Sequence, residues 1–198
     1  MKEPLPLARV QDAVLEFLRH RDDAALFGAQ AVNAYVDESR MTQDVDILSP
    51  RAAELAEEVR AHLAEAFHIA VRIRVVADGK GFRIFQVRQP KNRHLVDVRQ
   101  VDALPPWQIV ADVRVPVPEE LIAQKVIAYA RRGGQPKGGT DWRDLMTLFL
   151  TFPNLKAESG PVLDRLNAAQ ANPAALRKWR ELVDTEIDAG GGADDWDA

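Results

Sequence analysis

The chain of 198 residues contains no cysteine and only four histidines, at positions 20, 62, 68 and 94. The absence of cysteine excludes a disulfide, a thiolate zinc site, an iron–sulfur cluster and a cysteine nucleophile. The histidines are scattered, without a His-x-x-x-His pair, and we assign none of them a catalytic role. No apolar run approaches the roughly 18 residues of a membrane helix, and the first ten residues lack the apolar core of a signal peptide. We therefore expect a cytoplasmic protein.

Charge is close to balanced overall but unevenly distributed. Lysine and arginine number 26 and aspartate and glutamate 30, a net charge of −4 that argues against a general nucleic-acid coat. Residues 68–100 are rich in basic side chains. These side chains could attract an anionic substrate such as a nucleotide or RNA, or they could simply be the solvent-exposed faces of strands. Residues 181–198 are acidic, and we interpret 189–198 as a flexible acidic tail. The basic residues of the middle stretch are Arg72, Arg74, Lys80, Arg83, Arg88, Lys91, Arg93 and Arg99.

The apolar spacing predicts strands in the first part of the chain and helices in the second. Ser49-Pro50 is typical of a helix start, and Thr140 could cap a helix that begins at Asp141. The predicted helices span residues 6–21, 29–36, 50–67, 119–132, 141–150, 161–169 and 173–188. The predicted strands span residues 44–48, 71–76, 82–87 and 95–101, and residues 109–115 form a further strand or an extended connection.

This order of elements predicts an α+β fold rather than a regular doubly wound one. We expect a small mixed sheet with flanking helices, followed by a C-terminal helical region. The predicted domains are an α/β core over residues 1–115, a helical region packed on it over 116–188, and the tail over 189–198. No internal repeat is present.

Two carboxylates on one predicted strand indicate where the chemistry lies. Asp44 and Asp46 alternate with Val45 and Ile47, so the acids face one side and the apolar residues face the core. Like charges placed this way repel and need a compensating cation, for which Mg²⁺ is suited because it prefers oxygen ligands. An Asp-x-Asp pair alone also occurs by chance on a solvated strand edge.

A third acid, Asp97, lies in the predicted strand LVDVR, on the face opposite Val96 and Val98. If this strand neighbours the one that bears Asp44 and Asp46, three carboxylates converge. Three acids around two divalent ions are the arrangement used for in-line phosphoryl or nucleotidyl transfer.

With these residues in place, the sequence resembles the DNA polymerase beta-like nucleotidyltransferase superfamily. Gly28-Ala29, followed by Arg40-x-Thr42-x-Asp44-x-Asp46, is similar to its glycine turn and Asp-x-Asp strand. The nearest variety is the minimal and abortive-infection (AbiEii-type) nucleotidyltransferases, often the toxins of toxin–antitoxin pairs. Members of the family also carry, later in the chain, a helix with a lysine, then an arginine, a loop, and a helix with Asp-x-x-Asp-Leu. The sequence fits this order. These later positions are Lys125, Arg131 or Arg132, Asp141 and Asp144-Leu145.

The resemblance implies a role for each position. Asp44, Asp46 and Asp97 would be the catalytic and metal-binding carboxylates, with Asp97 the base for the incoming hydroxyl. Two Mg²⁺ ions would be the cofactors, with Mn²⁺ possible in their place. The substrate-binding residues would be Gly28, Ala29, Gln30, Arg40, Thr42, Lys125 and Asp141. Gly28 would let the backbone approach the triphosphate, and Lys125 would contact a phosphate.

Two departures from the family pattern affect this assignment. Many members carry Gly-Ser or Gly-Gly at the turn, whereas Ala29 has no hydroxyl, so Gln30 or backbone amides must replace it. The loop around Lys137 is also long, which makes Arg131, Arg132 and Lys137 alternative phosphate ligands. Structural interpretations stay open for Lys125 at a helix surface and for Asp141 in a first helical turn.

Two functions follow as hypotheses. The first is a Mg²⁺-dependent enzyme that moves a nucleoside monophosphate from a nucleoside triphosphate to a hydroxyl of a tRNA 3′ end, a protein side chain or a small molecule. It would pair with a cognate antitoxin and have no membrane partner. The alternative is a catalytically weak binding module that serves as an antitoxin or nucleotide sensor. A purely structural helical adaptor would not need the three acids.

Overall fold

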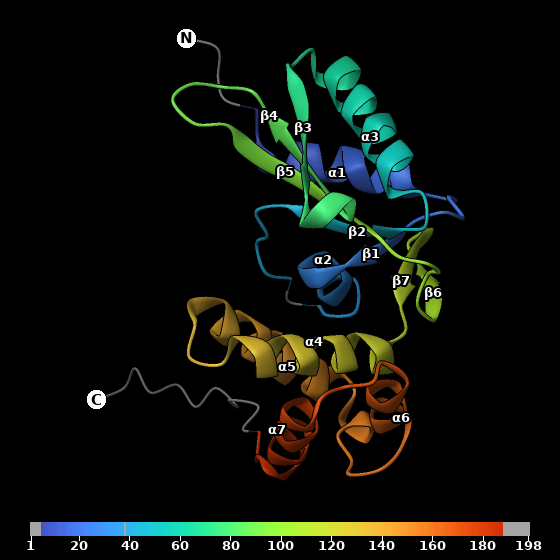
Figure 1. Cartoon of the computed structure of the whole chain (residues 1–198), viewed down its shortest axis with the longest axis vertical. Helices are drawn as coiled ribbons and strands as arrows, with labels where there is room; N and C mark the ends of the chain where they lie inside the picture. Colours follow the sequence, from blue (N-terminus) through green and yellow to red (C-terminus); the bar gives the residue numbers. More distant parts are fainter. Residues whose placement is uncertain (1–4, 38, 188–198) are drawn as a thin grey trace. The chain divides into compact units, whose positions relative to one another are not determined.

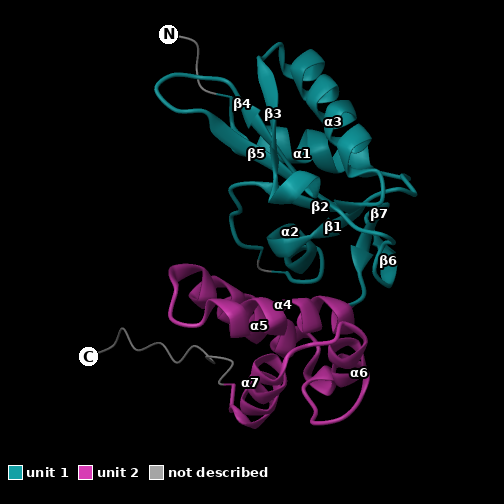
Figure 2. Ribbon diagram, viewed as in Figure 1, with its two compact units in different colours: residues 1–117 teal, residues 118–198 magenta. Residues whose placement is uncertain are grey.

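The computed structural model describes residues 5–37 and 39–187. It divides the chain into two compact units, residues 1–117 and 118–198 (Figure 1; Figure 2). The first unit contains every described strand, and the second is helical. The predicted acidic tail, residues 189–198, lies outside the described residues. Within the described part of the chain, no helix combines the length and the apolar character needed to cross a membrane.

A five-stranded mixed sheet organises the first unit (Figure 1). Its order is β1-β2-β5-β4-β3, with β2 and β5 parallel and the other neighbours antiparallel. The parallel pairing places β2 beside β5 near the centre of the sheet, although the two strands are far apart in the sequence. The strands are β1 (Ala25–Phe27), β2 (Val45–Ser49), β3 (Val71–Val76), β4 (Gly81–Gln86) and β5 (Arg93–Gln100).

Helix α3 (Ala52–Phe67) packs along the sheet against β3, β4 and β5, and α1 (Leu7–Leu18) packs beside α3. The core between them is apolar because the strands alternate, with buried residues on the covered face. The opposite face carries the charged residues of the central strands. Core side chains include Val14, Ile47, Leu55, Leu63, Ile84, Val96 and Val98.

Three smaller elements complete the first unit. Helix α2 (Gly28–Asn33) follows β1 directly and packs against β2. A 3₁₀ turn, η1 (Ala77–Gly79), joins β3 to β4. The strands β6 (Trp107–Val110) and β7 (Val113–Pro116) form a separate antiparallel hairpin that lies against β1.

In the second unit, α4 packs against α5, α6 and α7 (Figure 2). Its core contains Leu121, Leu148, Phe149 and Trp179, and the Asn172 side chain caps α7 by accepting a hydrogen bond from Ala175 N. The elements are α4 (Pro118–Arg132), α5 (Pro136–Thr151), η2 (Pro153–Leu155), α6 (Pro161–Ala168) and α7 (Pro173–Asp184). This architecture confirms the predicted α+β class.

Two helix starts differ from the sequence-based expectation. Helix α3 begins after Arg51 rather than at Ser49-Pro50, because Ser49 ends β2 and its hydroxyl accepts from Arg51 N at 3.0 Å. Helix α5 begins at Pro136, so Thr140 lies inside it and is not the cap. Proline suits a first helical turn. The missing side chain of Gly138 lets that turn approach the carbonyl of Arg132, where a Cβ would lie only 2.6 Å from the oxygen.

Candidate active site on the open face of the sheet

Strand β2 positions the first two carboxylates. Val45 and Ile47 are fully buried in the core, so Asp44 and Asp46 lie on the opposite side of the strand. In the parallel ladder Asp46 is the register partner of Asp97 on β5. The two aspartates therefore lie side by side on the open face, although they are far apart in the sequence.

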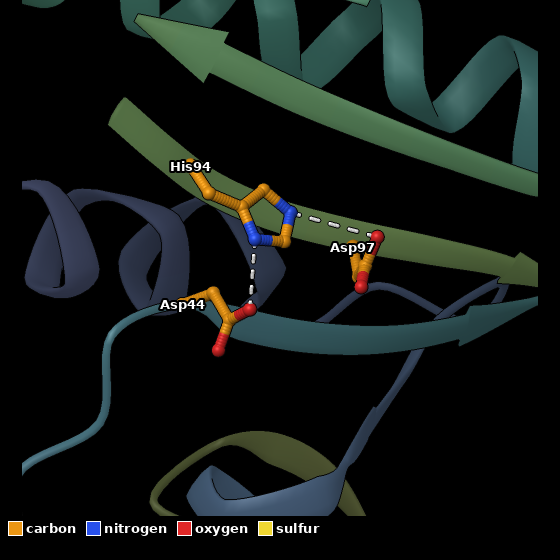
Figure 3. Close-up of side chains that lie close together, drawn as sticks. All are labelled: Asp44, His94 and Asp97. Carbon is orange, nitrogen blue, oxygen red and sulfur yellow. Dashed lines mark ion pairs between the residues drawn. The ribbon is translucent and has the colours of Figure 1, made fainter. Parts of the chain in front are cut away.

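Asp44, His94 and Asp97 form a compact group of side chains (Figure 3). One ligand atom from each residue lies within 4.8 Å of the other two. The Asp44 carboxylate oxygen Oδ2 lies 2.9 Å from His94 Nδ1, and Asp97 Oδ1 lies 3.6 Å from His94 Nε2. The imidazole ring of His94 therefore links Asp44, directly before β2, to Asp97 on β5.

Sequence reasoning assigned His94 no role, and a β-bulge explains why it is part of the group. In a regular strand, residues three apart face opposite sides. Between β4 and β5 the register shifts, since Ile84 pairs with Val96 but Phe85 pairs with His94. The extra residue, Leu95, turns His94 to the face of Asp97. The three-residue spacing from His94 to Asp97 carries no signal of this in the sequence alone.

The carboxylates dominate the electrostatics of the imidazole. Partial burial lowers the pKa of His94, but the interactions with Asp44 and Asp97 stabilise the protonated form and raise this pKa to about 9. For Asp97, burial raises the pKa, but the interaction with the nearby His94 and the charges of Arg83 and Arg99 outweigh burial and hold the pKa below its usual value. Asp97 is therefore ionised at neutral pH.

Two arginines partly compensate the acids. Arg83 Nε lies 3.2 Å from Asp97 Oδ1, and Arg99 Nη2 lies 3.6 Å from Asp46 Oδ1. The Arg99 guanidinium also stacks over the Phe27 ring, 4.7 Å from its centroid. With carboxylate oxygens and one imidazole nitrogen this close together, the donor set fits a divalent cation.

The turn at Gly28 allows α2 to begin against Asp46. Gly28 has a φ of +66°, in the left-handed region, and a Cβ there would lie 2.3 Å from Asp46 Oδ2. Any other residue would collide with the carboxylate. The glycine at this position is thus required by Asp46 itself, independently of any nucleotide.

Four other predicted binding residues lie in α2 or the loop before β2. Gln30 Nε2 donates to Thr42 Oγ1 at 2.9 Å, and Gln11 from α1 donates to the same hydroxyl at 2.8 Å. The backbone of Arg40 is held by the side chain of Asn33, and Ala29 is in the first turn of α2. Gln30 and Thr42 therefore brace the loop that leads into Asp44.

The remaining predicted residues, Lys125 and Asp141, belong to the second unit. Lys125 Nζ lies 2.6 Å from Asp144 Oδ2 and 3.7 Å from Asp141 Oδ1. Asp141 Oδ2 accepts from Arg132 Nη1 at 2.8 Å. Lys125, Asp141 and Asp144 are all buried, which makes a closed ion-pair network between α4 and α5. Arg131 and Lys137, the alternative phosphate ligands, are exposed.

Solved structures share this fold at low sequence identity. The Megavirus polyadenylate synthase matches with a TM-score of 0.61 and 13% identity, over 77% of this chain but only 33% of that one. The Helicobacter pylori protein JHP933 matches with a TM-score of 0.54 and 13% identity, over 89% and 87% of the two chains. ANT(2″)-Ia bound to adenylyl-2″-tobramycin matches with a TM-score of 0.52 and 14% identity, over 83% and 97%. At these identities the likeness establishes the fold alone.

A search of curated proteins finds no match. The model of one protein family, described as the nucleotidyl transferase AbiEii toxin of type IV toxin–antitoxin systems, matches residues 12–198. This match covers nearly the whole chain and confirms the resemblance found in the sequence. The chain therefore belongs to the AbiEii family of nucleotidyl transferase toxins.

Proposed function

We propose that the protein moves a nucleoside monophosphate from a nucleoside triphosphate to a hydroxyl acceptor, with Asp44, Asp46 and Asp97 as the catalytic carboxylates. Membership of the AbiEii family supports the general activity. The single observation that carries the site assignment is the pairing of Asp46 with Asp97 across β2 and β5, on the face that also bears Asp44.

The reaction needs one proton acceptor beside the incoming hydroxyl. The acceptor oxygen bonds to the α-phosphorus, the bond from that phosphorus to the oxygen bridging to the β-phosphorus breaks, and pyrophosphate leaves. We assign the hydroxyl proton to the carboxylate of Asp97. Asp97 is ionised at neutral pH, which is the form that can accept a proton.

The same three carboxylates are the proposed ligands of two Mg²⁺ ions, with Mn²⁺ as an alternative. Such ions, when bound, neutralise phosphate charge and make the attacking hydroxyl more acidic. The chain contributes oxygen donors on two adjacent strands, and Gly28 leaves room for the carboxylate of Asp46. Arg83 and Arg99 offset part of the negative charge and hold two of the carboxylates in place.

Nucleotide binding is proposed at the start of α2 and from the second unit. Gly28, Ala29 and Gln30 would offer backbone amides to the triphosphate, while Arg40 and Thr42 support the loop before Asp44. Lys125 and Asp141 complete the proposed set. Since Lys125 is bound to Asp144, a phosphate contact by this lysine would require it to exchange partners.

The acceptor is proposed to be polyanionic, with the 3′ end of an RNA such as tRNA as the leading candidate. Arg83 is the register partner of Asp97, and Arg74 is the partner of Arg83 on the next strand. A basic row of exposed side chains, Arg72, Arg74 and Arg83, thus extends from the carboxylates toward β3. Phosphates are attracted by such a row regardless of sequence. A protein side chain or a small molecule, by comparison with ANT(2″)-Ia and its adenylyl-tobramycin, is the competing acceptor class.

A cognate antitoxin is the proposed protein partner, since the family model is that of a toxin in a toxin–antitoxin system.

The test is transfer of α-labelled nucleotide. Purified protein is incubated with Mg²⁺ or Mn²⁺, with each of the four nucleoside triphosphates in turn, and with a cell extract. We expect label in one acceptor fraction, and we expect Asp46→Asn to reduce it by on the order of a hundredfold or more. Asp102→Asn, at an exposed aspartate after β5, is the matched control and should keep full activity.

Four outcomes separate the hypotheses. Label in the RNA fraction would support a polyanionic acceptor. Label in protein or in a small molecule would instead identify that class as the acceptor. Equal labelling by the wild type and Asp46→Asn would refute the site. No label from any nucleotide, together with nucleotide binding, would favour a catalytically weak binding module.

A further inference from the structure

We propose that His94 is a metal ligand through Nε2, and that this imidazole makes the site prefer Mn²⁺ over Mg²⁺. This inference rests on the proposed metal-dependent function and adds a residue and a metal preference to it. It is based on the geometry of His94 between two carboxylates, which the sequence did not predict.

The two ring nitrogens of His94 differ in their surroundings. Nδ1 lies 2.9 Å from Asp44 Oδ2, which is hydrogen-bond distance. Nε2 is buried and has no hydrogen-bond partner among the described residues. Asp97 Oδ1 lies 3.6 Å from it, too far for a hydrogen bond. A buried ring nitrogen without a partner is costly unless something else binds it.

The distance between Nε2 and Asp97 Oδ1 suits two ligands of one ion. Metal–ligand bonds of about 2.1 Å place adjacent ligands roughly 3.0–3.4 Å apart, so the observed spacing needs only a small adjustment. Asp97 is itself mostly buried, and its carboxylate is fixed by Arg83 from the neighbouring strand. Both donors are on β5, which limits the entropy lost when they bind a common ion.

Asp44 fits the role of an orienting partner for the ring. Histidines that bind metals usually donate their other N–H to a carboxylate, which fixes the tautomer and makes the ligating nitrogen more basic. The contact between His94 Nδ1 and Asp44 Oδ2 matches this arrangement. The tilted contact between His94 and the Phe85 ring, 5.0 Å between centroids, further restricts the ring.

The donor chemistry leads to the metal preference. Mg²⁺ prefers a shell of oxygen ligands, whereas first-row transition ions accept imidazole readily. A site in which the His94 imidazole and the Asp97 carboxylate bind the same ion therefore favours Mn²⁺ relative to an all-carboxylate site. The competing interpretation is that His94 only neutralises Asp44 and Asp97 as a protonated counter-ion and is displaced when a metal binds.

The experiment uses the full chain and Mn²⁺ alone, without nucleotide. Electron spin echo spectroscopy of bound Mn²⁺ detects a directly coordinated ¹⁴N, and a titration against Mg²⁺ gives the ratio of the two dissociation constants. We expect a ¹⁴N coupling in the wild type. In His94→Gln the coupling should be lost, and Mn²⁺ should bind on the order of tenfold more weakly, while Mg²⁺ binding changes much less. His62→Gln, which removes a histidine stacked on Phe17 elsewhere in the first unit, should match the wild type.

Mn²⁺ that binds without ¹⁴N coupling, or that does not bind, would overturn the proposal, and the wild-type measurement alone decides this even if His94→Gln does not fold. The outcome is separate from that of the proposed function. A ¹⁴N coupling without nucleotide transfer would leave His94 a ligand and favour the catalytically weak binding module over the enzyme. Transfer without the coupling would keep the enzyme and make His94 a displaced counter-ion.

Discussion

At the scale of single residues, Gly28 and Asp46 are mutually dependent. The left-handed backbone of Gly28 brings the start of α2 so close to Asp46 that even a methyl group would overlap the carboxylate. One effect of substitution is backbone strain and the other is displacement of a proposed catalytic group. The chain provides a control that separates them, because Gly79 also has a positive φ, of +86°, but a Cβ there would meet nothing within 4 Å.

We therefore predict different results for two alanine variants. Gly28→Ala and Gly79→Ala should each lose about 1–2 kcal/mol of stability from the left-handed backbone. Gly28→Ala should lose further stability through the overlap, and its nucleotidyl transfer should fall by at least tenfold because Asp46 is displaced. Thermal unfolding and the labelling assay measure the two effects. Equal activity of both variants would contradict the steric role of Gly28.

At the scale of secondary-structure elements, a cluster of ion pairs fastens the segment before β1 to α3. Arg21 holds both carboxylate oxygens of Asp23, at 2.9 and 2.8 Å, and Arg51 reaches Asp23 at 2.8 Å. Both arginines also contact Glu58 of α3, at 2.7 and 3.2 Å. The hydrogen bonds from Arg21 lower the pKa of Asp23 below its ordinary value of 3.8, against the opposing effect of burial.

This shift predicts a pH dependence of stability. A carboxyl group whose pKa is lower in the folded state stabilises the fold above its unfolded pKa and loses that contribution as the pH falls through the folded value. Asp23→Asn should thus be less stable than the wild type at pH 7, and the difference should shrink below about pH 3.8. Urea unfolding between pH 2.5 and 7 checks this, with the exposed neighbour Asp22→Asn as control. A difference that stays constant across this range would disprove the linkage.

The elements also indicate how far the sequence was informative. Alternation on β2 predicted that Asp44 and Asp46 share a face, and the fully buried Val45 and Ile47 agree with it. From the sequence alone we could only assume that β2 and β5 are neighbours, because strand order depends on tertiary packing. The inclusion of His94 was missed, since one extra residue at the bulge reverses the alternation.

The start of α5 was missed for a related reason. Residues 135–139 contain a proline and two glycines, which are typical of a loop. In the structure the proline lies in the first turn and Gly138 packs against the Arg132 carbonyl. Close packing against α4 outweighs the low helix propensity of the glycines, and such a contact cannot be read from local sequence.

At the scale of the whole molecule, the two units have separate cores and separate buried charges. The second unit depends on Lys125, which is 8% exposed and lies between Asp141 and Asp144. Removing one partner of a buried ion pair leaves the other uncompensated, at a cost of about 3–5 kcal/mol. Loss of this lysine should therefore act on one unit before the other.

We predict that Lys125→Met increases hydrogen exchange in α4 and α5 while the sheet of residues 1–117 keeps its protection. Lys137→Met, at an exposed lysine of the same unit, is the control. Replacing the partner carboxylate by an apolar side chain as well, in Lys125→Met/Asp144→Leu, should recover much of the lost stability. If transfer activity returns with stability, the role of Lys125 is structural. If the double variant is stable but inactive, the lysine contributes to the reaction itself.

The central parallel pairing also has a consequence for folding during synthesis on the ribosome. Asp46 and Asp97 meet only when β5 inserts between β2 and β4, so the β2–β5 ladder has to close a loop of about fifty residues. Non-local pairings of this kind form late compared with helices and hairpins. A nascent chain that has exposed only β1, α2, β2 and α3 has its Asp-x-Asp strand but no Asp97 beside it. Since the proposed reaction needs all three carboxylates, we expect no nucleotidyl transfer from the chain until β5 has been synthesised and has joined the sheet.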